Sequence, residues 1–100
     1  MLTVCAGAVC RSVAMALILK GEGMDAVALS FDWNTDMTFR WLSRWADRIV
    51  VMEPKYATKI LERYRTKIRV CDVGPDIWRN PLKDELLGKC DAWVRAGGLT

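Results

Sequence analysis

Four short apolar runs, separated by stretches with helical periodicity, constrain the fold of this 100-residue chain more than any other feature. The runs cover residues 2–4, 26–29, 48–52 and 68–71, and the third is the strongest strand signal. Strands joined by helices of about 10–15 residues form right-handed crossovers, so they lie parallel in one sheet. The pattern therefore predicts an α/β domain in which helices cover a four-stranded parallel sheet.

The stretches between the runs predict four helices, over residues 11–22, 36–45, 54–65 and 81–95. Asn34 or Thr35 is expected to cap the second helix, because both side chains can accept a hydrogen bond from its first turn. Pro54 is expected to begin the third, since proline is well tolerated at the first helical position. Residues 72–80 are rich in Gly, Pro, Asp and Asn, and they predict a loop.

The middle of the chain carries two side-chain stripes at helical spacing. Residues 40–69 contain nine basic and three acidic side chains, against a net charge of +3 for the whole chain. Five basic residues follow the spacing of an exposed helix face, so we favour a solvated face over a nucleic-acid partner. They are Arg40, Arg44, Lys55, Lys59 and Arg63. Met37, Trp41 and Trp45 recur every four residues and are expected to face the core.

The composition excludes several classes of function. The chain contains no histidine, which excludes Ser-His-Asp and Cys-His catalysis and removes the commonest transition-metal ligand. The four cysteines show no C-x2-C pair, so neither a zinc site nor any other metal or cofactor is expected. The longest apolar stretch, residues 13–19, is too short to cross a bilayer, and no signal-peptide pattern is visible. We therefore expect a cytoplasmic protein that does not associate with membranes.

The first strand leads into a cysteine that is followed, after five residues, by an arginine and a serine. The segment reads Cys5-Ala6-Gly7-Ala8-Val9-Cys10-Arg11-Ser12. A thiolate needs positive surroundings and a bound anion needs N–H donors, and a tight loop at a helix N-terminus supplies both. Residue frequencies alone give the pattern C-x5-R-[ST] in about 0.03 of chains with this composition. The alternative is that Cys5 is an ordinary buried cysteine at a strand end.

Two loops that are distant in sequence are expected to meet beside this cysteine. Ligands of parallel α/β sheets bind beyond the carboxyl ends of the strands, at the point where the strand order reverses. The loop after Cys5 leaves the first strand at that edge, and the loop that begins at Asp72 leaves the fourth strand there. The two loops should therefore border one crevice.

These residues resemble the low-molecular-weight protein tyrosine phosphatase family. The phosphate loop of that family reads V-C-x-G-N-x-C-R-S, and residues 4–12 follow it at every fixed position but one. Residues 46–52, Ala-Asp-Arg-Ile-Val-Val-Met, are similar to the strand after the second helix of the family. The resemblance implies that Cys5 is a nucleophile that forms a phosphocysteine, and that Arg11 binds the phosphoryl oxygens bidentately.

The resemblance also implies roles for the other residues of the loop. Ser12 would hydrogen-bond the Cys5 thiolate, and Cys10 could protect that thiolate as a reversible disulfide. The residues expected to bind phosphate are Ala6, Gly7, Ala8, Val9, Cys10 and Arg11. Three features depart from the family: Ala8 replaces its loop asparagine, Val13 replaces a proline, and the chain is about two-thirds of the usual length.

The general acid of the family lies in an Asp-Pro pair on a late loop, whereas this chain has Pro75-Asp76. Compact tyrosine-phosphatase-like proteins of about this length share the Pro-Asp order, so Asp76 is expected to be the acid, with Asp72 as the second candidate. The alternative is that Asp76 is an ordinary turn residue that follows Pro75 and has no catalytic role. Trp78 and Trp33 are candidates for the walls of the substrate pocket.

The expectation for the whole chain is one α/β domain over residues 1–100, with three layers and the strand order 2-1-3-4. The function expected is hydrolysis of phosphotyrosine in a phosphorylated protein, or of a small phosphomonoester, through a phosphocysteine. A thiol-based arsenate reductase is an alternative, although the close-spaced downstream cysteine pair of that class is missing. A phosphocysteine carrier of the sugar phosphotransfer type is less favoured, because such carriers lack the arginine. A non-catalytic anion-binding regulatory domain is a further alternative.

Overall fold

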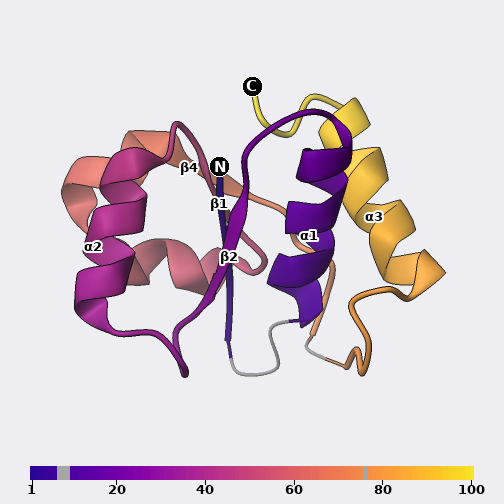
Figure 1. Ribbon diagram of the computed structural model, residues 1–100, viewed down its shortest axis with the longest axis horizontal. Helices are drawn as coiled ribbons and strands as arrows, with labels where there is room; N and C mark the ends of the chain where they lie inside the picture. Colours follow the sequence, from indigo (N-terminus) through magenta and orange to yellow (C-terminus); the bar gives the residue numbers. More distant parts are fainter. Residues whose placement is uncertain (7–9, 76) are drawn as a thin grey trace.

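A parallel sheet of four strands in the order β2-β1-β3-β4 lies at the centre of the fold (Figure 1). The computed structural model describes residues 1–6, 10–75 and 77–100. The strands are β1 (Leu2–Cys5), β2 (Val27–Ser30), β3 (Ile49–Val51) and β4 (Ile68–Val70). The α-helices are α1 (Cys10–Gly21), α2 (Asp36–Trp45) and α3 (Asp84–Arg95), and the two 3-10 helices are η1 (Pro54–Lys59) and η2 (Glu62–Lys67). The expected α/β class and strand order are confirmed.

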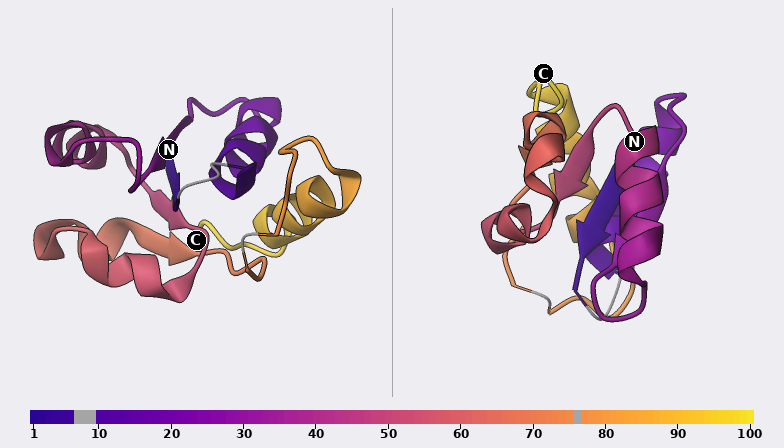
Figure 2. Two further views of the ribbon diagram at one scale, coloured as in Figure 1. Left: turned by 90° about the horizontal axis from the view of Figure 1, so that it is seen from below. Right: turned by 90° about the vertical axis from the view of Figure 1, so that its left-hand side faces the viewer.

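The helices form a layer on each face of the sheet. α1 and α3 cover one face, and α2 with η1 and η2 covers the other (Figure 2). β1 lies inside the sheet between β2 and β3, and all four of its residues are buried. Because β2 and β3 lie on opposite sides of β1, the strand order reverses there. Cys5, the last residue of β1, therefore stands at the position where such sheets bind ligands.

The expectation for the inner face of α2 is wrong. Met37, Trp41 and Trp45 are 59%, 64% and 48% exposed. The helix instead turns Phe39 and Ser43 inward, and the Phe39 ring stacks on Phe31 with a centroid distance of 4.7 Å and an interplanar angle of 2°. The apolar side chains span a wide arc of this helix, so periodicity alone allows more than one rotation about its axis. Packing against Phe31 selects the rotation that is observed.

Other element boundaries also differ from the expectations. Residues 54–65 form no continuous α-helix, because Ile60 and Leu61 adopt extended conformations that separate η1 from η2. The break lets the β-branched Ile60 enter the core, where it is 4% exposed. The last helix begins at Asp84, because the Asn80 side chain accepts a hydrogen bond from the Leu82 amide at 2.9 Å and holds residues 80–82 in a turn. Thr35 caps α2, accepting from the Thr38 amide at 3.3 Å.

The orientation of α2 can be tested by stability. We expect Phe39→Ala to lower the free energy of unfolding by about 2 kcal/mol, because it removes a stacked, half-buried ring. Trp41→Ala should change it by less than about 0.5 kcal/mol, because that side chain is largely in water. Urea denaturation followed by circular dichroism measures both. A larger loss for Trp41→Ala than for Phe39→Ala would contradict the observed rotation.

Candidate functional site

The thiol of Cys5 lies next to the hydroxyl of Ser12. The Cys5 Sγ and Ser12 Oγ atoms are 3.0 Å apart, and both residues are buried. Ser12 belongs to the first turn of α1, and its carbonyl accepts a hydrogen bond from the Thr3 hydroxyl at 2.6 Å. Thr3 thus fixes the start of α1 against β1, which brings the two reactive side chains together. The expected contact between Cys5 and Ser12 is present.

Arg11 is fully buried, and among the described residues its guanidinium group joins the start of α1 to the segments after β3 and after β4. Nη1 donates to a carboxylate oxygen of Glu53, just after β3, and to the Gly74 carbonyl at 3.0 Å. Nη2 donates to the Tyr56 hydroxyl at 3.2 Å. A buried charge is tolerated only when it is paired and hydrogen-bonded, and these partners meet that condition. They also fix the guanidinium in the lining of a cavity that Ala6, directly after Cys5, lines as well.

The ion pair shifts the titration of both partners. Burial alone would lower the pKa of Arg11, but its hydrogen bonds to Glu53 and Tyr56 outweigh this penalty and raise that pKa. The hydrogen bond from Arg11 is the main cause of the lowered pKa of Glu53, and burial opposes it. Lys55 lies 3.3 Å from the second carboxylate oxygen of Glu53 and lowers the same pKa further. Glu53 is therefore ionised wherever the fold is intact near neutral pH.

A cavity of about 510 Å³ opens over this network. Its described lining residues are Ala6, Arg11, Glu53, Pro54, Lys55, Tyr56, Asp72, Gly74 and Pro75. They come from the loop after β1, the segment after β3 and the loop after β4. The expected convergence of two distant loops is thus observed, and the segment that begins at Glu53 joins them.

Of the two candidate general acids, Asp72 is among the described residues and Asp76 is not. Asp72 lines the cavity, and its side chain accepts a hydrogen bond from the Gly74 amide at 3.0 Å. That bond closes the turn at Gly74, whose φ of +88° suits glycine. Asp76 lies outside the described residues, as do Gly7, Ala8 and Val9. The roles expected for these four residues stay predictions.

The remaining sequence candidates lie as follows. Cys10 begins α1 and is 7% exposed. Trp33 is 75% exposed, and Trp78 is half-buried beneath the Lys89 ammonium group, 5.8 Å from its ring centroid. Neither tryptophan is among the described residues that line the cavity. Their expected role as pocket walls stays a prediction.

Sequence reasoning missed Glu53 and Tyr56. A signal for Glu53 existed, because it follows the strongest strand, and that strand was expected to end at the same edge as Cys5. Tyr56 had no comparable signal. The sequence predicts a continuous helix at Tyr56, whereas in the structure the residue lies in η1 and its side chain points inward, with 2% of the residue exposed. The phenol and the carboxylate together complete the environment of Arg11.

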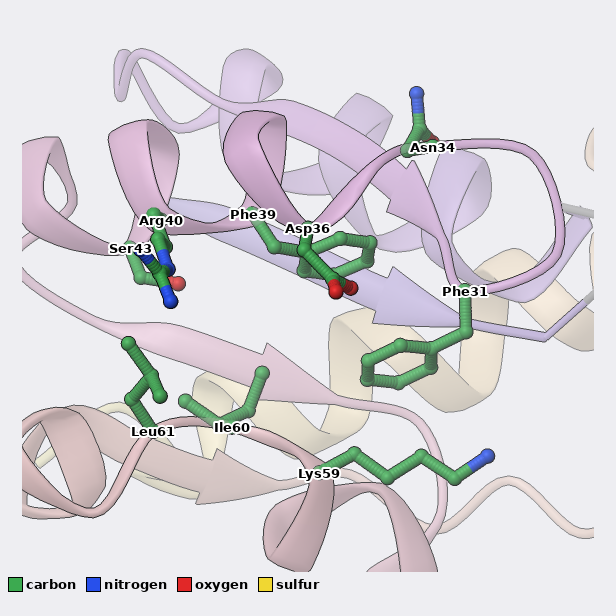
Figure 3. A pocket seen from close by; sticks show the side chains of 9 residues that line it. All are labelled: Phe31, Asn34, Asp36, Phe39, Arg40, Ser43, Lys59, Ile60 and Leu61. Atoms are coloured by element: carbon green, nitrogen blue, oxygen red, sulfur yellow. The ribbon is translucent and has the colours of Figure 1, made fainter.

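A second cavity, of about 440 Å³, lies between α2 and the junction of η1 with η2 (Figure 3). The rings of Phe31 and Phe39 lie on one side of it, and Ile60 and Leu61 face them from the other. The backbone of Phe31 touches the first site, because its amide donates to the Cys5 carbonyl at 3.1 Å. The two cavities are therefore neighbours.

Cys71 and Cys90 are buried at 1% and 0% exposure and hydrogen-bond each other. This bond, reinforced by burial, raises the pKa of Cys71, so its thiol stays protonated at neutral pH. Among the described residues, no group of three or more cysteine or acidic side chains is arranged to hold a metal ion. In the same part of the chain, no helix is long and apolar enough to cross a membrane.

Comparison of the chain with known protein families, with curated proteins and with solved structures gives no match.

The ion pair gives the fold a defined pH dependence. Because the pKa of Glu53 is lower in the folded state, its stabilising effect is complete above its unfolded pKa of about 4.3 and is lost as the pH falls through the folded value. We expect Glu53→Gln to lower the free energy of unfolding by about 1–3 kcal/mol at pH 7. The difference from wild type should begin to shrink below the unfolded pKa of about 4.3, and it should be lost only when the pH has fallen through the lowered folded pKa and Glu53 is protonated in the folded protein.

Urea denaturation at several pH values measures this difference, with the exposed Glu62→Gln as the matched control. A difference that is the same at pH 3 and pH 7 would show that the charge of Glu53 does not stabilise the fold.

Proposed function

We propose that this protein is a cysteine-dependent phosphatase that hydrolyses phosphomonoesters through a phosphocysteine intermediate. The observation that carries the proposal is the pairing of the buried Cys5 thiol with the Ser12 hydroxyl, 3.0 Å away, next to a buried arginine. A hydroxyl donor stabilises a thiolate, and arginine is suited to bind phosphate. The first turn of α1 contains no acidic residue that would repel a bound anion.

The reaction has two steps. In the first, the Cys5 thiolate forms a bond to phosphorus as the bond to the leaving oxygen breaks, and an acid protonates that oxygen. In the second, water attacks the phosphocysteine, a carboxylate accepts its proton, and inorganic phosphate and the thiolate are released. Arg11 and the N–H groups at the start of α1 balance the charge of the transferring phosphoryl group, so this mechanism requires no metal.

The surroundings of the other cysteines support hydrolysis over thiol-based reduction of arsenate. Such a reductase must pass a disulfide from its nucleophile to further thiols. Cys71 and Cys90 pair with each other in the core, where they are 1% and 0% exposed, and neither is among the described residues that line the cavity. Disulfide exchange requires access of one thiol to the other sulfur, so two buried thiols outside the cavity are poorly placed for it.

The first test concerns the nucleophile. Wild-type protein should hydrolyse 4-nitrophenyl phosphate without added metal, and Cys5→Ser should show no measurable turnover. Ser12→Ala should lower the rate by about 10²-fold, because it removes a donor to the thiolate. Rapid acid quenching followed by mass spectrometry should find one phosphoryl group on Cys5. Turnover by Cys5→Ser would rule out the mechanism, and phosphate binding without turnover would favour the non-catalytic domain.

The second test concerns the acid. Asp76→Asn should lower kcat by about 10²–10⁴-fold for phenyl phosphate, whose leaving group is strongly basic. The loss should be smaller for 4-nitrophenyl phosphate, which needs less help from an acid. Asp72→Asn is the matched control, because asparagine can still accept the Gly74 hydrogen bond. The assignment is reversed if the leaving-group dependence follows Asp72, and it fails if neither variant shows one.

A further inference from the structure

The wall between the two cavities is built from residues that also hold the reacting groups. Phe31 is bonded through its amide to the Cys5 carbonyl at 3.1 Å, and Tyr56 accepts from Arg11 at 3.2 Å. The rings of Phe31 and Tyr56 lie 5.4 Å apart between centroids. The Lys59 ammonium group is 5.1 Å and 5.8 Å from these two rings. The second cavity therefore begins at the wall of the first.

The described lining of the second cavity combines apolar side chains with polar and charged ones. Figure 3 shows Phe31 and Lys59 at the end of the cavity toward which the strands run, with Arg40, Ser43 and Leu61 at the other end. Its volume of about 440 Å³ falls within the range of small-ligand sites. Its described lining includes two cationic side chains, Arg40 and Lys59, and one carboxylate, Asp36. These features suit an apolar group that carries negative charge beside it.

A small phosphomonoester has no part that would reach this cavity. The first cavity, of about 510 Å³, is large enough for a phosphoryl group together with a phenyl ring. An extended peptide advances about 3.3 Å per residue, so a side chain two or three positions away can pass the Phe31–Tyr56 wall. A peptide can therefore fill both cavities at once.

We propose that the second cavity is a specificity subsite for a phosphorylated peptide. It binds an apolar side chain near the phosphorylated residue, and Arg40 and Lys59 favour an acidic residue next to that side chain. The substrate is then a phosphorylated protein segment, and small phosphomonoesters are poor substitutes for it. This inference rests on the proposed phosphatase function and goes beyond it by assigning a second recognition site and the side chains that it prefers.

The substrate arm of the test compares two sets of phosphotyrosyl peptides and 4-nitrophenyl phosphate. In the first set, a leucine next to a glutamate is placed in turn at each position within three residues of the phosphotyrosine. In the second set, alanine replaces the leucine and lysine replaces the glutamate. At the preferred position, leucine with glutamate should raise kcat/KM at least about tenfold over the alanine-lysine peptide, as expected for burial of one leucine side chain.

The variant arm uses two matched pairs. Arg40→Glu alters a charged residue of the cavity lining, whereas Arg44→Glu makes the same charge change on the same helix at a residue outside the lining. Leu61→Glu alters an apolar residue of the lining, and Leu82→Glu changes another exposed leucine that lies elsewhere. Each lining variant should lower the ratio of peptide to 4-nitrophenyl phosphate kcat/KM by about tenfold, and each control should leave this ratio unchanged.

The result separates the two proposals. Efficient hydrolysis of 4-nitrophenyl phosphate with no preference among the peptides would overturn the subsite and leave the phosphatase standing. Equal ratios for lining variants and controls would also overturn the subsite. If no ester is hydrolysed, the phosphatase proposal fails, and fluorescence anisotropy of the labelled peptides then decides the subsite. Equal affinity for the leucine and alanine peptides would overturn it, whereas tighter binding of the leucine peptide that Leu61→Glu abolishes would support it.

Discussion

The buried guanidinium of Arg11 is the interaction on which the rest of the site depends. An unpaired charge in the interior costs several kcal/mol, so the partners of Arg11 must all be in place when the chain is folded. Those partners are Glu53 after β3, the Tyr56 phenol in η1 and the Gly74 carbonyl after β4. One side chain at the start of α1 thus fixes the segments after β3 and after β4, although its partners there lie 42 to 63 residues away from Arg11 along the chain. The short strands only have to bring these segments to one edge of the sheet.

The alternation of strands and helices was sufficient to predict the parallel sheet, because the handedness and spacing of crossovers leave few alternatives. It was not sufficient to orient α2. Met37, Trp41 and Trp45 follow helical spacing as well as Phe39 does, and only the partner ring of Phe31 decides which face turns inward. Such a choice depends on contacts between elements, which periodicity within one element does not contain.

The candidate site, like the fold, could be predicted from the sequence only in part. The contact between Cys5 and Ser12 was predicted from the resemblance of residues 4–12 to the phosphate loop of a known family, and it is present. The partners of Arg11 were not predicted, since Tyr56 was placed on a regular helix and the 3-10 geometry of η1 changes its direction. The position of Glu53 directly after a strand was predictable, but a carboxylate is not expected beside a loop that is predicted to bind phosphate. Local patterns identified the candidate reactive groups, and tertiary contacts revealed the residues that hold them in place.

The pairing of Arg11 with Glu53 also affects how a substrate reaches the site. The positive charge of the arginine is already balanced by Glu53, so under the proposed function it attracts a distant phosphate only weakly. If the site binds phosphate as proposed, binding is an exchange of partners, in which phosphate oxygens compete with the Glu53 carboxylate for the same guanidinium. Anions with a single charge, or without two oxygens that can bind the guanidinium side by side, compete weakly in such an exchange. An exchange of this kind selects an anion by its geometry at close range, while the ion pair between Arg11 and Glu53 stabilises the fold without one.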